Sequence, residues 1–359
     1  MKKAIYAIGA LFLAAAVIIG CRVSGIFMGG GRGDGAIGSE AFTEPRGITV
    51  AANGAVLIAD KGHAIRRLLP GGTVERIAGT YIKGNSGNLG PAINAQISDP
   101  IDVATDASGD LYFSDDAGIH AVEHGNIRLV VDCPKAIFGI YDTSEWLYAA
   151  FPSAVGSGIR VKRWRIPFVG TATCDGEVIA GSGSTGFSGD GGPATAASLS
   201  VPSDVVVPAT GAVYIADTGN NRIRRVDPIT SLITTVAGGG MQLGDGGPAL
   251  AARLFLPQSV AVGTFGDIYI ADFANHRVRH VARDGMIETL LGTGLRQDVN
   301  AWIEDKDPAK QPISSPFGVA LSLDEQIVYA SSELDRVVRF VKDNPTPVPT
   351  STETATPTS

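Results

Sequence analysis

The sequence predicts an all-β protein that folds as a six-bladed β-propeller with four-stranded blades. The composition favours this class, because the 359 residues include 46 glycines and only 18% are charged, which suits a turn-rich β protein better than a helical bundle. A proline followed by two short apolar segments recurs six times along the chain. A loop of nearly the same letters also occurs twice, as "GDGGPATAASLSVP" at 189–202 and "GDGGPALAARLFLP" at 244–257.

The six repeats keep a constant phase. The second apolar segment starts twelve residues after the proline, and the residue fifteen after the proline is an aspartate in four of the six copies. Self-similarity at a fixed spacing is the signature of a repeat array. The prolines are Pro45, Pro100, Pro134, Pro202, Pro257 and Pro316, and the residues fifteen further on are Asp60, Asp115, Ala149, Asp217, Asp272 and Ser331.

Each repeat contains four strand signals. In the fourth repeat, "SDVVVPATGAVYIAD" predicts two strands joined by a turn at 209–211, "NRIRRVDP" alternates as a third strand, and "LITTVAGGG" is a fourth strand stopped by glycines. Four antiparallel strands per unit are typical of a propeller blade. One blade cannot bury both faces of its sheet, so we expect neighbouring blades to pack on each other.

The two ends of the chain are predicted to meet in the last blade. The sixth repeat has only three strand signals, ending at "RVVRFVKD". The segment 24–45 matches the fourth strand and outgoing loop of the other repeats. We therefore expect the N-terminal strand to complete the last blade, which removes an exposed sheet edge and fixes the blade count at six.

The first 20 residues are predicted to be a signal peptide, since two lysines precede an apolar run; an uncleaved membrane helix is the alternative. The run ends in "IIGC", which resembles the bacterial lipobox and implies that Cys21 carries lipid. Arg22 is not the aspartate that commonly retains lipoproteins at the inner membrane, so an outer membrane is favoured where the host has one. Residues 21–343 form the predicted propeller, and the Pro/Thr-rich residues 344–359 form a disordered tail.

Residues 24–343 resemble the NHL-repeat family. The resemblance rests on "VPSDVVVPATGAVYIADTGNNRIRRV" and "LPQSVAVGTFGDIYIADFANHRVRHV", with a good third copy, "EPRGITVAANGAVLIADKGHAIRRL", in the first repeat. It implies a rigid propeller that hosts sensors, ligand-binding proteins or enzymes. Related six-bladed lactonases and the NHL-type amidating lyase place metal ligands at the mouth of the central channel.

The residues just after the loop prolines are the candidate binding residues at this mouth. No Glu or His is among them, so we expect no catalytic residue, metal or cofactor there. The function favoured is a non-enzymatic binding module for a protein or polar ligand, carbohydrate included; the alternative is a metal-assisted lactonase-like or lyase-like enzyme. The candidate binding residues are Arg46, Asp102, Lys135, Asp204 and Gln258.

Other polar motifs are interpreted as structural because they recur with the repeats. The loop residues Asp190 and Asp245 are expected to bond local amides. We expect two turn pairs, in which a carboxylate meets a guanidinium five residues later. These are Asp217 with Arg222 and Asp272 with Arg277.

Three further expectations concern partners and cysteines. A net charge of −7 argues against nucleic acid as a partner. An N-terminal strand that begins close after Cys21 would set one propeller face against the membrane and turn the loop-rich face, with the channel mouth, away from it. Cys133 is placed at the start of an inner strand and Cys174 at the opposite face, which predicts two free thiols.

Overall fold

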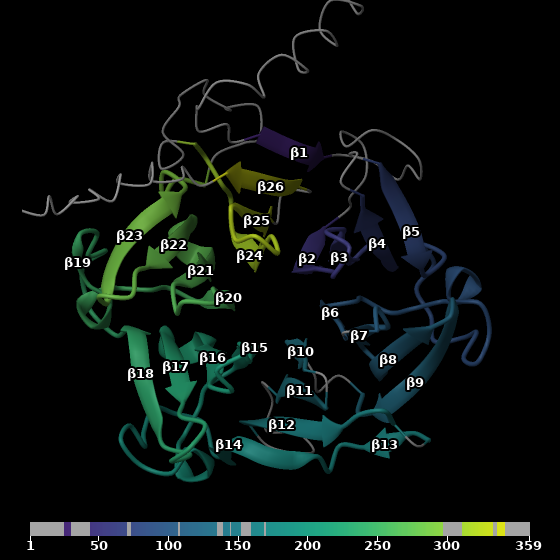
Figure 1. Cartoon of the computed structure of the whole chain (residues 1–359), viewed down its shortest axis with the longest axis horizontal. Helices are drawn as coiled ribbons and strands as arrows, with labels where there is room; N and C mark the ends of the chain where they lie inside the picture. The colour runs from purple at the N-terminus through teal and green to yellow at the C-terminus, as the bar shows by residue number, and fades with distance from the viewer. Residues whose placement is uncertain are drawn as a thin grey trace, which may run out of the picture.

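In the computed structural model, six antiparallel sheets surround a central axis (Figure 1). The structure describes residues 25–29, 44–69, 73–106, 108–134, 139–143, 145–151, 159–168, 170–296, 311–332 and 336–341. The predicted all-β, six-bladed propeller is confirmed. No helix in these segments is both long and apolar enough to cross a membrane.

Each blade is described from its inner strand outward. The first three blades are β2 (Pro45–Val50), β3 (Val56–Asp60), β4 (Ala64–Leu68) and β5 (Val74–Ala78); β6 (Asp102–Thr105), β7 (Leu111–Asp115), β8 (Gly118–Glu123) and β9 (Asn126–Asp132); and β10 (Ile140–Asp142), β11 (Trp146–Phe151), β12 (Ile159–Arg165) and β14 (Glu177–Gly183).

The last three blades follow the same order, and two short strands add a fifth member to blades 2 and 5. The strands are β15 (Pro202–Val206), β16 (Val213–Asp217), β17 (Arg222–Val226) and β18 (Ile233–Gly238); β20 (Pro257–Val262), β21 (Ile268–Asp272), β22 (Arg277–Val281) and β23 (Met286–Leu291); β24 (Pro316–Leu321), β25 (Ile327–Ser332), β26 (Arg336–Val341) and β1 (Gly25–Gly29); with β13 (Ala172–Thr173) on blade 2 and β19 (Gly247–Pro248) on blade 5.

The N-terminal strand β1 lies in the last blade. It pairs antiparallel with β26, so the sheet order is β1-β26-β25-β24 and the outer strand comes from the start of the chain. In Figure 1, β1 lies along the outer side of β26.

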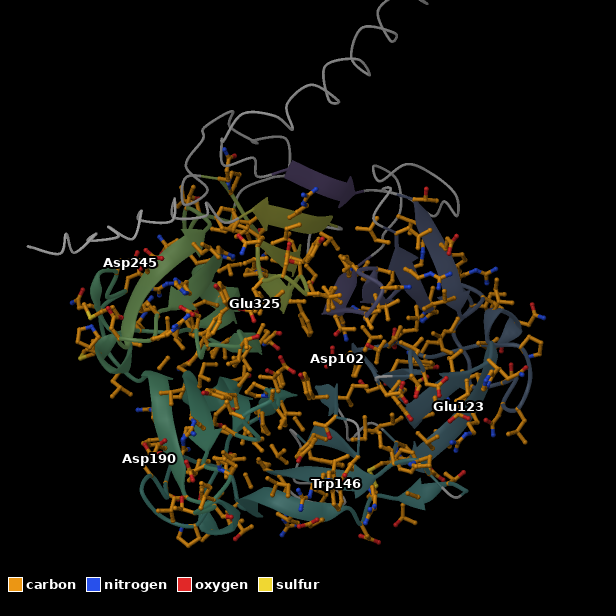
Figure 2. All side chains as sticks on the ribbon, viewed as in Figure 1. Asp102, Glu123, Trp146, Asp190, Asp245 and Glu325 are labelled. Atoms are coloured by element: carbon orange, nitrogen blue, oxygen red, sulfur yellow. A yellow bond between two sulfur atoms is a disulfide. The ribbon has the colours of Figure 1, made fainter. Side chains whose placement is uncertain are left out.

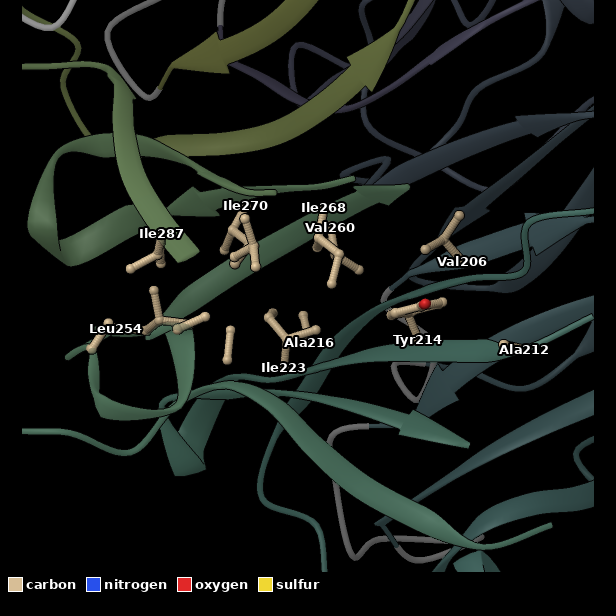
Figure 3. Close-up of a cluster of buried hydrophobic side chains, with 14 residues drawn as sticks. Val206, Ala212, Tyr214, Ala216, Ile223, Leu254, Val260, Ile268, Ile270 and Ile287 are labelled. Atoms are coloured by element: carbon tan, nitrogen blue, oxygen red, sulfur yellow. The ribbon is translucent and has the colours of Figure 1, made fainter. Parts of the chain in front are cut away.

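The core lies between adjacent blades. The second strand of a blade is buried at every position in blades 1, 2, 4 and 5, because both faces of its sheet pack on a neighbour. Figure 3 shows the cluster between blades 4 and 5, which includes Tyr214 and Ile223 of blade 4 and Ile270 and Ile287 of blade 5. Burial of such side chains stabilises the fold by about 1.5–3 kcal/mol each.

The repeated "GDGGPA" loop covers the outer edge of the next blade. Gly191 N donates to Ile233 O at 2.8 Å and Ile233 N donates to Gly192 O at 3.0 Å, so the loop pairs with the outer strand β18. Gly246 N donates to Ile287 O of β23 in the same way. Unpaired strand edges favour aggregation, so this loop protects each edge it covers.

The aspartates of this loop do not bond local amides, contrary to the prediction. Asp190 accepts a hydrogen bond from Arg224 Nη2 at 2.7 Å and from Thr235 Oγ1 at 2.7 Å. Asp245 makes the equivalent 2.6 Å contact with Arg279. Because the loop lies on the following blade, its carboxylate meets that blade's side chains.

The predicted turn pairs also have different partners. Asp217 contacts Arg224 at 3.3 Å and Asp272 contacts Arg279 at 3.5 Å. Arg222 lies opposite Asp217 in strand register, but its guanidinium donates to Asn220 O at 2.7 Å and stacks 3.9 Å from the Phe187 ring. The buried carboxylate therefore pairs with the fully buried arginine two residues further along the strand.

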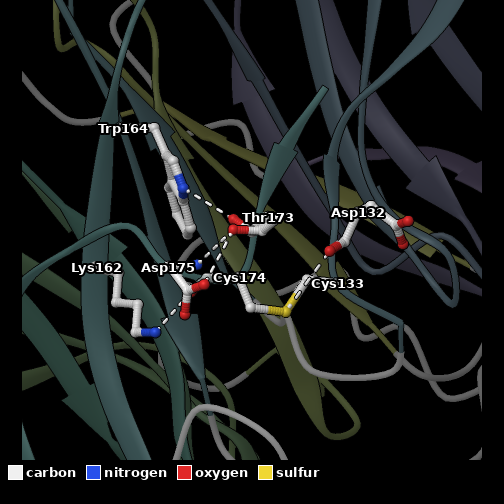
Figure 4. Close-up of a disulfide and its surroundings, with 7 residues drawn as sticks. All are labelled: Asp132, Cys133, Lys162, Trp164, Thr173, Cys174 and Asp175. Carbon is white, nitrogen blue, oxygen red and sulfur yellow. Dashed lines mark hydrogen bonds between the residues drawn. A yellow bond between two sulfur atoms is a disulfide. The ribbon is translucent and has the colours of Figure 1, made fainter. Parts of the chain in front are cut away.

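Cys133 and Cys174 form a disulfide with a Cα–Cα distance of 5.2 Å, so the prediction of two free thiols is wrong (Figure 4). The inner strand of blade 3 starts at Ile140 rather than beside Pro134. Cys133 therefore follows β9, the outer strand of blade 2. Cys174 follows β13, which leaves blade 3 to pair in parallel with β9, and this excursion brings the two cysteines together.

Two faces follow from the strand order. The inner strands begin at the face that also holds the connections between blades and the turns between second and third strands. We call it the loop-rich face. The loop-poor face holds the turns between first and second and between third and fourth strands.

Candidate functional site: the channel and the loop-rich face

One residue near the start of each inner strand forms a ring around the channel. The ring alternates between glycine and a polar residue over much of its circumference. In Figure 2, Asp102 lies beside the centre of the ring, whereas Asp190 and Asp245 lie at the outer rim. In blade order the ring residues are Gly47, Asp102, Gly139, Asp204, Ser259 and Gly318.

The polar members of this ring join one blade to the next. Asp102 Oδ2 accepts a hydrogen bond from Ile140 N at 2.8 Å. Asp204 Oδ2 accepts one from Val260 N at 2.9 Å. Ser259 Oγ accepts one from Val319 N at 3.2 Å. Each side chain therefore satisfies a backbone donor of the following inner strand, a structural task that leaves less of the side chain for a ligand.

The glycines of the ring make room for the aspartates. A Cβ atom on Gly47 would lie 1.9 Å from Asp102 Oδ1, and one on Gly139 would lie 2.4 Å from Asp204 Cα. No side chain fits at such distances. Packing therefore requires a glycine at the ring position that precedes each ring aspartate.

The two carboxyl groups bind protons more tightly than ordinary aspartates. Burial raises the pKa of Asp204 to about 7, although hydrogen bonds from Val260, Ser259 and Val205 oppose the shift. Burial, followed by the charge of Asp204, raises the pKa of Asp102 well above its usual value. Near neutral pH the channel consequently carries less negative charge than two free aspartates would supply.

The channel encloses about 240 Å³. Ligand pockets usually measure roughly 300–1,000 Å³, so this cavity suits only a small ligand or water. Its lining combines the two aspartates with inner-strand side chains such as Thr49, Tyr141 and Val262. Two of the candidate binding residues, Asp102 and Asp204, line this channel, and their role in binding stays a prediction.

Arg46 and Gln258 are not part of the channel lining that the structure describes. Arg46 pairs with Glu44 at 3.3 Å and lies 5.5 Å from the centre of the Phe317 ring. The main-chain oxygen of Gln258 accepts a hydrogen bond from Ser203 Oγ at 2.7 Å. Lys135 lies outside the described residues. Of the predicted mouth residues that the structure describes, Asp102 and Asp204 line the channel.

Two of the histidines hold neighbouring blades together. His63 Nδ1 accepts a hydrogen bond from Asp99 N at 3.3 Å, and His276 Nδ1 accepts one from Ser315 N at 3.0 Å. Asn221 plays the same part in blade 4, since its Oδ1 accepts from Leu256 N at 2.8 Å. Among the residues that the structure describes, no three His, Cys, Asp or Glu side chains form a group able to hold a metal ion.

A second cavity opens on the loop-rich face where blades 4 and 5 meet. We call it the blade 4–5 pocket. It encloses about 350 Å³ and is lined by Asn220, Asn221, Arg222, Gly239, Gly240, Arg253, Leu254 and Phe255. Sequence reasoning missed it because Arg222 was assigned to a turn pair. The exposed aromatic residues in two successive connections, Phe187 and Phe255, were the available signal.

The fold and its repeats agree with known proteins. The family model of the teneurin NHL domain matches residues 236–303, which contain blade 5. This chain is built from NHL-type repeats. Teneurin-3 of Danio rerio is 38% identical over 100 residues, which cover 24% of this chain and 4% of that protein. Protein SUPPRESSOR OF QUENCHING 1, chloroplastic, of Arabidopsis thaliana is 25% identical over 293 residues, or 73% of this chain and 28% of that protein. The NHL-repeat chain thus spans a small part of either relative.

Solved structures share the propeller fold at low identity. An auxiliary nutrient binding protein from Bacteroides ovatus superposes with a TM-score of 0.61 at 15% identity, over 90% of this chain and 77% of that one. A streptogramin B lyase gives 0.50 at 14% identity, over 89% and 97%. A gluconolactonase from Xanthomonas campestris gives 0.52 at 12% identity, over 84% and 86%. These likenesses establish the fold for the NHL-repeat chain and leave its function to its own residues.

Proposed function

We propose that this NHL-repeat propeller is a non-enzymatic binding module of the cell envelope that takes a protein or polar ligand, such as a saccharide, on its loop-rich face. The observation that carries the proposal is the composition of that face over blades 3 to 5. Phe187 and Phe255 are each 44% exposed and Met241 is 87% exposed, and Arg253 is exposed beside Phe255. Aromatic residues, Met and Arg are enriched in protein interfaces.

The nutrient-binding likeness agrees with this proposal, while the ring residues contribute little to it. Asp102 and Asp204 are occupied by backbone donors of the next blade. Loops on a rigid scaffold commonly carry the binding residues of a protein. We therefore extend the proposed surface from the channel mouth outward across the connections of blades 3 to 5.

The anchor is part of the same proposal. Lipid on Cys21 would hold the propeller at a membrane, with the outer membrane favoured where one exists. β1 runs antiparallel to β26, so Gly25 lies at the loop-poor end of blade 6, four residues after Cys21 in the sequence. Four residues reach at most about 14 Å, which would direct the loop-rich face away from the membrane. Feeding cells a labelled fatty acid tests this: label should enter the wild-type protein, and label retained by Cys21→Ser would refute the anchor.

A pair of matched surface variants tests the binding face. Met241→Glu places a charge in an exposed position of the loop-rich face, and Ile229→Glu does the same at the loop-poor face, where Ile229 is 91% exposed. We expect the first variant to lower capture of envelope components by the lipid-free propeller at least tenfold, and the second to leave it unchanged. Both should melt like the wild type. The reverse pattern would place binding on the other face.

A metal-assisted propeller enzyme of lactonase-like or lyase-like type is the second candidate. It is favoured by the raised pKa of Asp102 and of Asp204 in one cavity, since perturbed carboxyl groups cluster at functional sites. Elemental analysis of the purified chain separates the two candidates. Stoichiometric zinc or calcium that is lost in Asp204→Asn would favour the enzyme.

A further inference from the structure

The blade 4–5 pocket presents hydrogen-bond donors and no carboxylate. None of its lining residues is acidic, whereas two are arginines. Arg253 is exposed, and the central carbon of its guanidinium lies 5.9 Å from the centre of the Phe255 ring. Asn221 accepts a hydrogen bond from Leu256 N through its Oδ1 atom, which leaves its side-chain Nδ2 as a donor for a ligand.

Arg222 is fixed in place with donors to spare. Its Nη1 atom donates to Asn220 O at 2.7 Å, and its guanidinium lies 3.9 Å from the centre of the Phe187 ring. Gly239 borders it so closely that a Cβ there would meet Nη2 at 2.7 Å. Within the described part of the chain, no acceptor engages Nε or Nη2 of Arg222. A guanidinium held on an aromatic face is pre-organised, so little side-chain entropy is lost when it binds a ligand.

The matching arginine of blade 5 is satisfied by the protein itself. Arg277 donates Nη1 to Asn275 O at 3.0 Å and Nη2 to Thr293 O at 2.9 Å. Thr293 follows Gly292 as Gly239 follows Gly238 in blade 4. The arginine at this position of the repeat therefore donates from both Nη atoms to main-chain oxygens in blade 5, but from Nη1 alone in blade 4 among the described residues. The pocket is thus a feature of this place in the ring and is not common to every blade.

We propose that the blade 4–5 pocket binds the carboxylate of a small polar molecule, such as a sugar acid, through Arg222 and Arg253. A planar guanidinium matches the two oxygens of a carboxylate. About 350 Å³ lies at the lower end of the usual range for small-ligand pockets, and Leu254 with Phe255 supplies an apolar wall for the rest of the molecule. This inference rests on the proposed function and names the ligand class for one part of the loop-rich face.

Calorimetric titration of the lipid-free full chain tests the proposal with three probes: galacturonate, galactose and inorganic phosphate. Galacturonate should bind, galactose should bind at least tenfold more weakly because it lacks the carboxylate, and phosphate should also bind more weakly. Absence of galacturonate binding, or equal binding of galactose, overturns the proposal. Tighter binding of phosphate overturns the assignment of a carboxylate.

Variants assign the effect to the pocket. Arg222→Ala and Arg253→Ala should each weaken galacturonate binding roughly tenfold or more, since each removes a charge-assisted contact. Arg222→Lys should recover only part of the loss, because an ammonium lacks the planar fork. Arg277→Ala is the matched control and should leave the affinity unchanged. An equal loss in Arg277→Ala would show a structural effect and overturn the assignment.

The titration also separates this inference from the broader function. If Met241→Glu abolishes envelope capture while galacturonate fails to bind the wild-type chain, the loop-rich face remains the binding surface and the carboxylate site is wrong. If galacturonate binds and capture is insensitive to Met241→Glu, the pocket stands and the proposed face-wide function is wrong.

Discussion

Blades 4 and 5 hold their incoming loops by ion pairs, whereas blade 3 uses the same strand position to hold a cross-linked segment. In blades 4 and 5 the cation on the third strand, Arg224 or Arg279, binds the aspartate of the loop that covers the blade. In blade 3 the equivalent cation is Lys162, which donates to the main-chain oxygen of Cys174 at 2.6 Å (Figure 4).

The difference shows how an irregular repeat keeps its place in the ring. The segment held by Lys162 carries β13 onto the neighbouring blade 2 and is fastened there by the Cys133–Cys174 disulfide. Trp164 Nε1 adds a hydrogen bond to Thr173 O at 3.2 Å. A lysine lacks the planar guanidinium that binds the loop carboxylate in blades 4 and 5. Blade 3 has a disulfide to blade 2 in place of that ion pair.

The largest effect is expected from Arg224→Met. The change leaves the fully buried carboxylate of Asp217 without its cation, and breaking a buried pair typically costs about 3–5 kcal/mol. Urea unfolding followed by tryptophan fluorescence measures the loss. Arg225→Met is the control, because Arg225 forms a partly exposed pair with Asp227 just after the same strand, and ion pairs near the surface contribute less than about 1 kcal/mol. Equal losses would remove the distinction between the two arginines.

The disulfide should come next. Cys133 and Cys174 are 41 residues apart, and a cross-link closing such a loop stabilises a fold by about 2–4 kcal/mol. Cys133→Ala with Cys174→Ala should lower the free energy of unfolding by that amount, and reductant should then have no further effect. Thiol titration of the denatured, unreduced wild-type protein should detect neither cysteine. Two reactive thiols would show that the link between blades 2 and 3 is absent.

Asp204 should make the stability of the folded protein depend on pH. The pKa of Asp204 is raised from 3.8 to about 7 in the folded protein, so the folded state binds this proton more tightly than the unfolded state. The contribution of Asp204 to stability is then full below pH 4, falls as pH rises, and is lost above about pH 7. The stability of the wild type relative to Asp204→Asn should decrease across this window. A difference that stays constant from pH 4 to 8 would contradict the raised pKa.

The smallest effect is expected at the loop carboxylates. Asp190 is 38% exposed at its side chain although it binds the buried Arg224, so solvent screens the pair and Asp190→Ala should cost about 1 kcal/mol. Asp245→Ala should behave alike, because Asp245 is 41% exposed and binds Arg279. Thermal melts measure both changes. A loss as large as that of Arg224→Met would mean that the loop contact dominates over the buried pair.

The sequence by itself determined the six blades and most of their register. In five blades the loop proline stands two residues before the ring position: Pro45, Pro100, Pro202, Pro257 and Pro316. This spacing recurs because strand alternation and turn residues are local properties that are encoded again in each repeat. Those prolines also led directly to Asp102 and Asp204. Pro134 is the exception, since Gly139 takes the ring position in blade 3 and the phase shifts by three residues.

Tertiary structure alone decided which side chains meet between blades. The pairing of Cys133 with Cys174 depends on β13 crossing to blade 2, and the choice of Arg224 over Arg222 depends on which guanidinium is buried beside Asp217. The pocket at Arg222 depends on a glycine at position 239 and on Phe187 from a preceding loop. Such contacts join residues from separate repeats, so the local pattern that defines a blade carries no information about them.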